Sequence, residues 1–434
     1  MYTVGLYTLG CKVAQYETEA IAEEFMRRGL KVLSFSEVCD AYVINTCTVT
    51  GEADGKSRKQ IRRAIAKNPD AVVAVLGCYS QRAPIEVLGI EGVDIVLGTD
   101  GKMTVVDKVI NALTFGVRVK ENATLPLENA GFEPMCITAA PRTRAYVKIE
   151  DGCECKCTYC AIAPARGAVR SKLPAEVVRE VEGLYAVGTR EVVLTGIETG
   201  SYGRDFDFKY NLADLILELD RRKSAERIRL GSLAPELVGA EFAERVAKAE
   251  ILTPHFHISM QSGSDKILRA MKRRYTRATA LENIKRLKAK IPRAQFTTDI
   301  MVGFPGESDE DFAATLSFIR EARLLDAHIF AYSKRAGTPA EAYPDQVPEG
   351  VKRARSKMAK ELSAAVRDEV LSDIVKRSTV LTAILESGKD GVFTAHSDEY
   401  VALTVYAPEM QQGDMVKVRP VSHKNGVVQC ELID

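Results

Sequence analysis

The stretch that decides the fold class is Asp151-Gly152-Cys153-Glu154-Cys155-Lys156-Cys157-Thr158-Tyr159-Cys160. Its cysteines Cys153, Cys157 and Cys160 are spaced C-x3-C-x2-C, so a short loop can direct three thiolates at one iron–sulfur cluster. A [4Fe–4S] cluster normally takes four thiolates, and three leave one iron open to another ligand. The spacing therefore predicts a cluster with chemistry at its open iron.

Two simpler sites compete with this interpretation. A zinc site usually takes paired C-x2-C units, and only one such unit, Cys157 to Cys160, lies here. A thioredoxin-like C-x2-C motif explains neither Cys153 nor the preceding Asp151-Gly152. Cys155 is an additional thiol in the loop, and as a fourth ligand it would close the cluster.

Length and composition limit the class of protein. With 434 residues, of which 46% are hydrophobic, we expect about two to four domains with substantial cores. Lysine and arginine (60) balance aspartate and glutamate (59), so any nucleic-acid site must be a local patch. No apolar run approaches the roughly 18 residues of a membrane span, and the start lacks a signal-peptide pattern. We expect a cytoplasmic protein whose ten cysteines serve metal binding or catalysis rather than a disulfide framework.

Residues 1–113 alternate short apolar segments with amphipathic ones. This alternation predicts βαβ units and a doubly wound parallel sheet. The expected strands are 4–9, 41–46, 71–76 and 95–97, and the expected helices are 16–28, 53–68 and 102–113. The pattern lapses over 114–143, which we expect to be a linker.

A second series of strands and helices fills residues 144–370. Six strands suit an incomplete (β/α)6 barrel better than an eightfold one. They are expected at 145–149, 191–195, 227–230, 255–259, 296–301 and 327–332, with helices at 174–187, 212–221, 278–288, 309–323 and 350–375. Residues 371–434 change to five short strands with Gly, Asp and Asn between them, which predicts a small OB-like β-barrel. The fold class is therefore α/β with this added barrel.

A second set of cysteines follows strands of the N-terminal sheet. Cys11, Cys47 and Cys78 each come within two residues of the end of an expected strand. Ligands of open parallel sheets bind outside the carboxyl ends of the strands, so these thiols predict a shared metal site. The competing interpretation is that they are buried small hydrophobic residues, which is how we interpret Cys39, Cys136 and Cys430.

Residues 151–160 resemble the cluster loop of radical S-adenosylmethionine (radical SAM) enzymes. Residues 8–17, Thr8-Leu9-Gly10-Cys11-Lys12-Val13-Ala14-Gln15-Tyr16-Glu17, resemble the N-terminal signature of the methylthiotransferases. The likeness is greatest to the MtaB branch, which modifies threonylcarbamoyladenosine in tRNA. Further matches lie at 45–50, 77–79, 194–196, 260–264, 272–276, 299–307 and 332–339, and the C-terminal barrel resembles the RNA-binding TRAM domain of this family.

The resemblance implies two [4Fe–4S] clusters and S-adenosylmethionine (SAM). Cys153, Cys157 and Cys160 match the ligands of the radical-forming cluster, with Cys155 as a bystander, and Cys11, Cys47 and Cys78 match those of an auxiliary cluster. One SAM would supply a methyl group to a sulfide on the auxiliary cluster. A second would give the radical that activates C2–H of the adenosine. An electron donor such as flavodoxin or ferredoxin and a source of sulfur are implied as partners.

Turns at the ends of barrel strands are candidates for contacts with SAM. These candidates are Tyr159, Gly196, Glu198, Gln261 and Asp299, and ordinary turn or capping chemistry is the competing explanation for them. The chain departs from the family pattern at two places. Ala14 replaces a usual asparagine, and Gly231-Ser232-Leu233-Ala234 replaces Ser-Ser-x-Glu, which removes a glutamate.

Two basic patches predict contacts with the tRNA anticodon stem-loop. On the expected helix 53–68, side chains four residues apart share one helical face, and a phosphate backbone would relieve their repulsion. The candidates are Arg58, Lys59, Arg62 and Arg63 on this helix and Arg273 and Arg274 in the barrel. A solvated charged face is the simpler interpretation. An anticodon-loop base is exposed and can enter a pocket without the opening of a duplex.

Three functions remain in competition. The first is a tRNA methylthiotransferase, acting as a monomer on threonylcarbamoyladenosine. The second keeps the chemistry but changes the substrate to another tRNA adenosine or a ribosomal-protein aspartate. The third is a non-catalytic iron–sulfur protein that binds RNA or carries electrons, which would need a fully ligated cluster.

Overall fold

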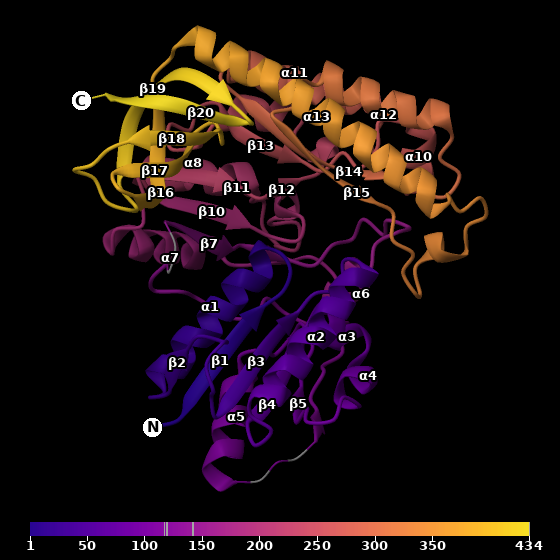
Figure 1. The fold of residues 1–434 in the computed structure, drawn as a ribbon, viewed down its shortest axis with the longest axis vertical. Coiled ribbons are helices and arrows are strands. Elements are labelled where there is room, and N and C mark those ends of the chain that lie inside the picture. Colours follow the sequence, from indigo (N-terminus) through magenta and orange to yellow (C-terminus); the bar gives the residue numbers. More distant parts are fainter. Residues whose placement is uncertain (117, 119, 141–142, 434) are drawn as a thin grey trace.

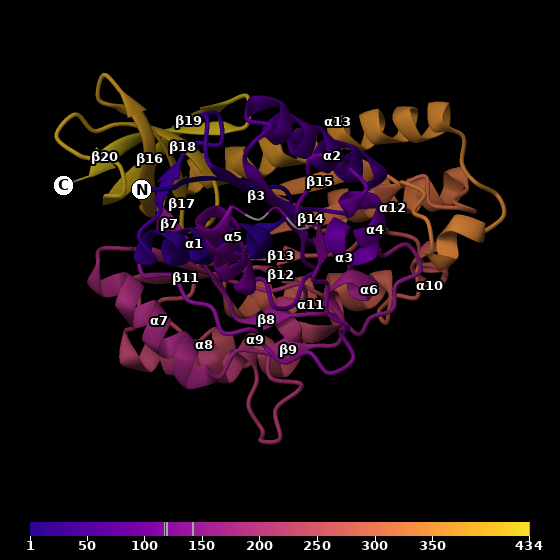
Figure 2. The same cartoon turned by 90° about the horizontal axis from the view of Figure 1, so that it is seen from below.

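The computed structural model describes residues 1–433 except 117, 119, 141 and 142. The N-terminal sheet lies against one side of the central barrel, and the C-terminal barrel sits at one end of it (Figure 1). In the view turned by 90°, the helix α2 (Gly51–Lys67) lies on the opposite side from α8 (Leu212–Arg222) (Figure 2).

The N-terminal domain is a parallel sheet with strand order β2-β1-β3-β4-β5-β6. The strands are β1 (Thr3–Thr8), β2 (Lys31–Leu33), β3 (Ala41–Thr46), β4 (Val72–Gly77), β5 (Ile95–Val96) and β6 (Glu121–Asn122). Helices α1 (Lys12–Arg27) and α5 (Thr104–Phe115) cover one face, and α2 with α4 (Pro84–Leu88) covers the other. The doubly wound prediction is confirmed, and the short edge strands β2 and β6 are additions to it.

The central domain is an open barrel made of two sheets. One sheet has the order β11-β10-β7 and the other β12-β13-β14-β15. Their strands are β7 (Arg144–Lys148), β10 (Glu191–Thr195), β11 (Arg227–Leu230), β12 (Ser232–Leu233), β13 (His255–Ile258), β14 (Gln295–Val302) and β15 (Asp326–Ala331). Because β12 continues β11 after the single residue Gly231, the barrel has the six strand positions that were predicted.

Helices alternate with these strands, as the sequence predicts. They are α6 (Ile162–Arg166), α7 (Pro174–Ala186), α8, α9 (Ala240–Val246), α10 (Asp265–Ala270), α11 (Arg277–Lys290) and α12 (Asp309–Glu321). A small hairpin of β8 (Glu150–Asp151) and β9 (Arg170–Ser171) brackets the cysteine loop and α6. The hairpin therefore fixes both ends of the segment that carries Cys153, Cys157 and Cys160.

One helix, α1, belongs to two cores. Its residues Ile21 and Phe25 pack into the N-terminal sheet, whereas Tyr16 and Ala20 pack into the core of the barrel. The helix begins directly after Cys11. This shared packing places the N-terminal cysteines next to the barrel. In the segment 114–143, Met135 and Ile137 are also buried in the barrel core.

The C-terminal domain is a closed five-stranded barrel in the order β16-β17-β18-β20-β19. Its strands are β16 (Leu381–Lys389), β17 (Val392–Ser397), β18 (Ala402–Tyr406), β19 (Met415–Lys424) and β20 (Val427–Ile433). The long helix α13 (Glu349–Arg377) joins it to the central barrel, with Val366 in one core and Leu371 in the other. The predicted small barrel is confirmed.

Buried arginines attach this small barrel to the first residues of the central strands. Arg227 donates to the backbone oxygens of Thr382 and His396 at 3.3 Å each. Arg229 donates to the backbone oxygens of Ser397 and Asp398 at 3.1 and 3.2 Å. Both guanidiniums also pair with the buried Glu191. The two barrels are therefore joined through a charged but fully partnered interface.

Candidate functional site

The N-terminal thiols Cys11, Cys47 and Cys78 lie at the carboxyl edge of the parallel sheet. Cys11 is the N-cap of α1, Cys47 follows β3, and Cys78 opens α3 (Cys78–Arg82) directly after β4. β1 and β3 are the strands at which the order of winding reverses, which is where sheets of this class bind ligands. The three thiols interact electrostatically, so the structure brings together cysteines that are distant in sequence.

The turn before Cys11 packs closely against Cys47. A Cβ on Gly10, whose φ is +116°, would lie 3.3 Å from Sγ of Cys47. Burial raises the pKa of Cys47 to about 11 and also raises the pKa of Cys78. As free thiols these groups keep their protons at neutral pH, and a positive metal centre is what converts such groups to thiolates.

The second set of cysteines lines one cavity. Cys153, Cys157 and Cys160 border a space of about 680 Å³, together with residues of α6 and the segment 167–168. Cys155 is absent from the lining of this cavity. Its thiol interacts with Cys153, and this interaction lowers the pKa of Cys155 to about 6. Three thiols around one space match the donor set that the spacing predicts.

The turn before the loop requires glycine. Gly152 has a φ of +88°, and a Cβ there would lie 1.8 Å from the backbone oxygen of Ala168. Cys153 donates its backbone N–H to Gly167 at 3.0 Å. The loop is therefore held close to the chain beyond α6.

Among the described residues, no three His, Cys, Asp or Glu side chains are gathered tightly enough for a single metal ion.

A smaller cavity of about 180 Å³ joins three of the predicted SAM contacts. Tyr159, Gln261 and Asp299 line it beside Cys160, and Val49 and Thr50 of the N-terminal domain complete it from the other side. The cavity therefore lies between the cysteine loop, the barrel interior and the chain that follows Cys47.

Gln261 has the two marks of a binding residue. Its Oε1 is buried without a hydrogen-bond partner. Its φ of +66° lies in the left-handed region, a strained conformation that is concentrated at functional sites. The backbone N–H of Gln261 donates to the oxygen of Asp299 at 2.8 Å, which fixes the two residues together. An unpaired acceptor on the wall of a cavity is suited to a ligand that donates hydrogen bonds.

Asp299 faces a histidine. Burial acts to raise the pKa of Asp299, but His257, with Nε2 3.3 Å from Oδ2, brings the pKa below its ordinary value. Asp299 is therefore an anion on the cavity wall. Such a carboxylate can accept hydrogen bonds from hydroxyl or amino groups of a ligand.

Glu198 and Gly196 lie deeper, behind the end of β10. Burial raises the pKa of Glu198 to about 8. A Cβ on Gly196 would lie 2.4 Å from Oε2 of Glu150, so packing against Glu150 already requires glycine there. Glu150 Oε2 also accepts the backbone N–H of Glu198 at 2.9 Å. Neither residue lines the two cavities described above, and their contact with SAM stays a prediction.

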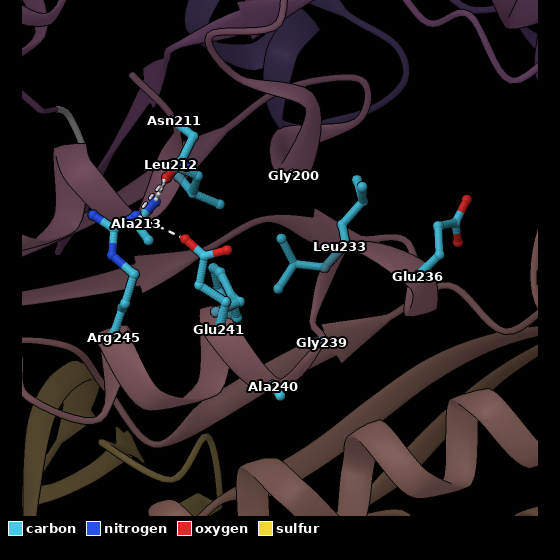
Figure 3. Close-up of a pocket in the computed structure, with 12 residues that line it drawn as sticks. Gly200, Asn211, Leu212, Ala213, Leu233, Glu236, Gly239, Ala240, Glu241 and Arg245 are labelled. Carbon is cyan, nitrogen blue, oxygen red and sulfur yellow. Dashed lines mark hydrogen bonds and ion pairs between the residues drawn. The ribbon is translucent and has the colours of Figure 1, made fainter. Parts of the chain in front are cut away.

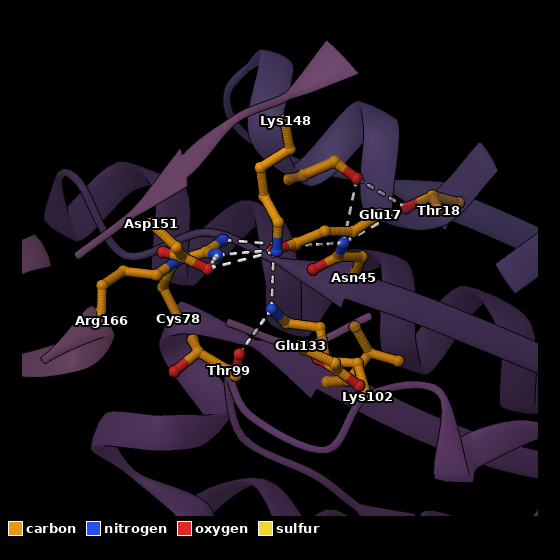
Figure 4. A network of polar contacts seen from close by, with 12 residues as sticks. Glu17, Thr18, Asn45, Cys78, Thr99, Lys102, Glu133, Lys148, Asp151 and Arg166 are labelled. Atoms are coloured by element: carbon orange, nitrogen blue, oxygen red, sulfur yellow. Dashed lines mark hydrogen bonds and ion pairs between the residues drawn. The ribbon is translucent and has the colours of Figure 1, made fainter. Parts of the chain in front are cut away.

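A buried network of charges connects the two sets of cysteines (Figure 4). Glu17 of α1 accepts from Arg166 at 2.6 Å, Lys102 at 2.7 Å and Lys148 at 3.3 Å. Asp151 accepts from Arg166 at 3.0 Å and Lys148 at 3.3 Å. Although burial opposes ionisation, these cations lower the pKa of Glu17 well below its usual range and that of Asp151 to about 2.

Sequence reasoning did not identify this network. Its acids and bases come from five separate segments, and none forms a run of charge. The available signal was position: Asp151 lies two residues before Cys153, and Arg166 lies six residues after Cys160. Buried charges are expected to be paired, so only the fold shows which segments meet.

Two arginines of the predicted basic patches have partners within the protein, and their contact with tRNA stays a prediction. Arg273 is directed inward, to Sγ of Cys157 at 3.2 Å and the hydroxyl of Tyr275 at 2.9 Å, because the loop folds over the cysteines. Arg58 bonds Tyr79 at 3.0 Å and Glu86 at 3.1 Å. Lys59, Arg62 and Arg63 are exposed on α2, and Arg274 is exposed beside the larger cavity.

A further cavity of about 320 Å³ lies on the outside of the barrel, near the start of α8 and along α9 (Figure 3). Arg245 in its wall pairs with Glu241 at 3.7 Å. None of the predicted site residues lines it, and it is separate from the cysteine cavities.

In the described part of the chain, no helix is both long enough and apolar enough to span a bilayer.

Parts of the chain match known families. Residues 147–319 match the Radical SAM superfamily, which covers most of the central barrel. Residues 3–98 match a family described as Uncharacterized protein family UPF0004, which covers the N-terminal sheet and its three cysteines. The two matches therefore divide along the two domains that carry the cysteine sets.

Relatives match over nearly the full length. The chain is 39% identical to the threonylcarbamoyladenosine tRNA methylthiotransferase MtaB of Bacillus subtilis (strain 168), over 96% of this chain and 94% of that protein. It is 35% identical to a protein of the same name from Thermotoga maritima, over 99% and 97%. A tRNA-2-methylthio-N(6)-dimethylallyladenosine synthase from Carboxydothermus hydrogenoformans is 34% identical over 84% of each chain.

A solved structure supports the fold. TsrM from Kitasatospora setae, a radical S-adenosylmethionine methyltransferase with cobalamin and a [4Fe-4S] cluster bound, matches with a TM-score of 0.59 over 78% of this chain and 77% of that chain. Its identity to this chain is 17%, so the likeness concerns the fold alone. Together with the full-length relatives, these matches show that the chain belongs to the MtaB-type tRNA methylthiotransferases, enzymes of the radical SAM superfamily, which uses SAM and a [4Fe–4S] cluster.

Proposed function

We propose that this protein transfers a methylthio group to C2 of N6-threonylcarbamoyladenosine beside the tRNA anticodon, with two [4Fe–4S] clusters. The single observation that supports a second cluster is that Cys11, Cys47 and Cys78 lie together where the winding order of the N-terminal sheet reverses. The choice of adenosine rests on the names of the full-length relatives.

Each set of three thiols suits a cluster that keeps one iron free of cysteine. Cys153, Cys157 and Cys160 would hold the radical-forming cluster in the cavity of about 680 Å³, and Cys11, Cys47 and Cys78 would hold the auxiliary cluster. When bound, the clusters and SAM supply a radical able to take the C2 hydrogen, which no side chain removes as a proton.

The chain's own side chains would bind and orient SAM. Gln261 Oε1, which lacks a partner, would accept a hydrogen bond from a SAM hydroxyl or ammonium group, and the anionic Asp299 would accept another. Val49 and Thr50 close the cavity from the side of the auxiliary cysteines and limit the access of water. The substrate base would enter between the two cysteine sets.

Contact with tRNA would use the exposed cations of α2 and the small C-terminal barrel. Lys59, Arg62 and Arg63 lie on the helix that follows Cys47, so phosphates bound there would bring the anticodon loop close to the auxiliary cysteines. A low-potential electron donor, such as a flavodoxin or ferredoxin, and a sulfur donor would restore the clusters in the cytoplasm.

Mass spectrometry of total tRNA nucleosides, from cells with and without this protein, tests the function. We expect the methylthio derivative of threonylcarbamoyladenosine to disappear when the protein is absent. Loss of methylthio-dimethylallyladenosine instead would favour the second candidate, which the 34% identity to the Carboxydothermus hydrogenoformans synthase supports. An unchanged nucleoside profile would contradict both, and iron analysis should give about eight irons per chain, four from each cluster.

A further inference from the structure

An arginine contacts one cysteine of the auxiliary set. Arg166 donates Nε–H to Sγ of Cys78 at 3.2 Å, and its other nitrogens bond Glu17 and Asp151. All three partners are buried, and Arg166 itself is 0% exposed. Because it starts from α6, the helix that follows Cys160, this side chain crosses from the radical-SAM barrel to the N-terminal sheet.

A second arginine makes the equivalent contact in the other set. Arg273 donates Nη1–H to Sγ of Cys157 at 3.2 Å. Its Nε bonds the hydroxyl of Tyr275 at 2.9 Å, and its Nη2 bonds the backbone oxygen of Ser259 at 3.2 Å. The guanidinium therefore lies fixed over Tyr275, 5.0 Å from the ring centre.

The charges around Arg166 do not cancel. Lys102, Lys148, Arg166 and Arg170 carry four positive charges, whereas Glu17 and Asp151 carry two negative charges. A buried group of this kind is costly unless a further anion joins it. Cys78, as the thiolate of a cluster, would be that anion.

We propose that Arg166 and Arg273 are positioning residues that set the reduction potentials of the two clusters separately, through N–H···S hydrogen bonds to Cys78 and Cys157. The inference rests on the proposed function, because it needs both clusters. Reduction adds one electron, and so makes each cluster more negative. A cation and a hydrogen bond at a ligand sulfur favour that reduced form and raise the potential.

Separate control of the two reduction potentials matters because the two clusters have different functions. The radical-forming cluster, when bound, would supply an electron to SAM. The auxiliary cluster must keep sulfur for transfer and need not be reduced at the same potential. With one arginine on each, the chain can adjust one potential without the other.

The test is redox titration followed by electron paramagnetic resonance, with one cluster present at a time. The auxiliary cluster is measured in protein with Cys153, Cys157 and Cys160 replaced by alanine, and the radical cluster with Cys11, Cys47 and Cys78 replaced. Arg166→Met and Arg273→Met are introduced into each background. In Arg166→Met, Glu17 keeps Lys102 and Lys148 as partners and Asp151 keeps Lys148 and Arg170, so neither buried carboxylate is left unpaired.

In Arg166→Met we expect the equilibrium constant for reducing the auxiliary cluster to fall at least tenfold, which is about 59 mV for one electron. The radical cluster should not shift in that variant. Arg273→Met should give the reverse pattern, so each variant is the control for the other. Lysine at either position keeps the positive charge and should recover part of the reduction potential that the methionine variant loses. Potentials that do not move, or that move together in both clusters, would overturn the proposal.

A second measurement needs no arginine variant, so it does not depend on whether those variants fold. Electron–nuclear double resonance of each cluster in H2O and in D2O should detect an exchangeable proton coupled to the cluster. Its absence from both clusters would overturn the proposal. A preparation that binds only four irons would instead refute the two-cluster function, which keeps the two failures distinct.

Discussion

The buried carboxyl group of Glu198 accepts the backbone N–H of Ala234 at 3.0 Å. Ala234 directly follows β12, at the position where the family pattern has a glutamate, and the carboxyl group of Glu198 lies beside it. With its pKa raised to about 8 by burial, Glu198 is mostly protonated at pH 7 in the absence of SAM. A cation arriving beside it would favour its ionised form.

The first prediction is that SAM binding releases a proton from Glu198. Calorimetry at pH 7 in buffers of different ionisation enthalpy should show the release of up to one proton per SAM bound. Glu198→Gln should abolish the release and weaken binding about tenfold or more. Glu226→Gln, at an exposed pair with Arg190, is the matched control and should leave both values unchanged. Equal proton release by parent and Glu198→Gln would contradict the role of Glu198.

The same raised pKa has a consequence for stability. The unfolded state loses this proton near pH 4.5, while the folded state keeps it to about pH 8. The contribution of Glu198 to folding is therefore most favourable at low pH and is lost as the pH rises through that window. Denaturation at several pH values should show Glu198→Gln gaining on the parent by up to about 1.4 kcal/mol per pH unit between pH 5 and 8.

The second prediction concerns the charge network. Glu17→Ala removes the carboxylate that Arg166, Lys102 and Lys148 share, and leaves their charges buried. We expect a loss of about 3 to 5 kcal/mol in the free energy of unfolding, measured by urea denaturation. Glu24→Ala lies on the same helix but removes only surface pairs with Arg27 and Arg28, and should cost less than about 1 kcal/mol. Similar losses in both variants would show that the network is not stabilising.

The third prediction separates the cysteines. Cys157→Ala should abolish deoxyadenosine formation and keep the auxiliary cluster, whereas Cys47→Ala should keep SAM cleavage and stop methylthiolation. Cys155→Ala should keep about eight irons and both activities, because Cys155 does not line the cavity of the other three thiols. Chromatography of the nucleoside products and iron analysis measure all three. Loss of iron in Cys155→Ala would mean that Cys155 is a ligand.

The fourth prediction concerns tRNA affinity. Replacement of Lys59, Arg62 and Arg63 by glutamine should weaken binding and reduce the slope of log affinity against log salt by about 2 to 3, since each phosphate contact releases a counterion. The matched control replaces three exposed cations at or just beyond the ends of α8 and α9, which lie on the opposite side from α2 (Figure 2): Arg221, Lys223 and Lys248. If the control lowered the slope as much as the α2 variant did, α2 would not be the tRNA-binding surface.

Most of the architecture could be predicted from the sequence because its signals are local. The βα alternation gave both parallel domains, and the bounds of the long helices were correct within a few residues. Edge strands of two or three residues, such as β2 and β6, have too few residues for a period to be detected. The cysteines could be placed because each follows a strand. The inward direction of Arg273 could not, because it depends on a contact with Cys157, which lies 116 residues earlier.

The attachment of the small C-terminal barrel has a consequence for how this protein can change over evolution. Arg227 and Arg229 hold that barrel by the backbone oxygens of residues 382 and 396–398. A backbone oxygen is present whatever side chain the residue carries. Mutations at these positions can therefore accumulate without breaking those bonds, and the outer surface of the barrel is free to adapt to a different RNA while its orientation is inherited unchanged.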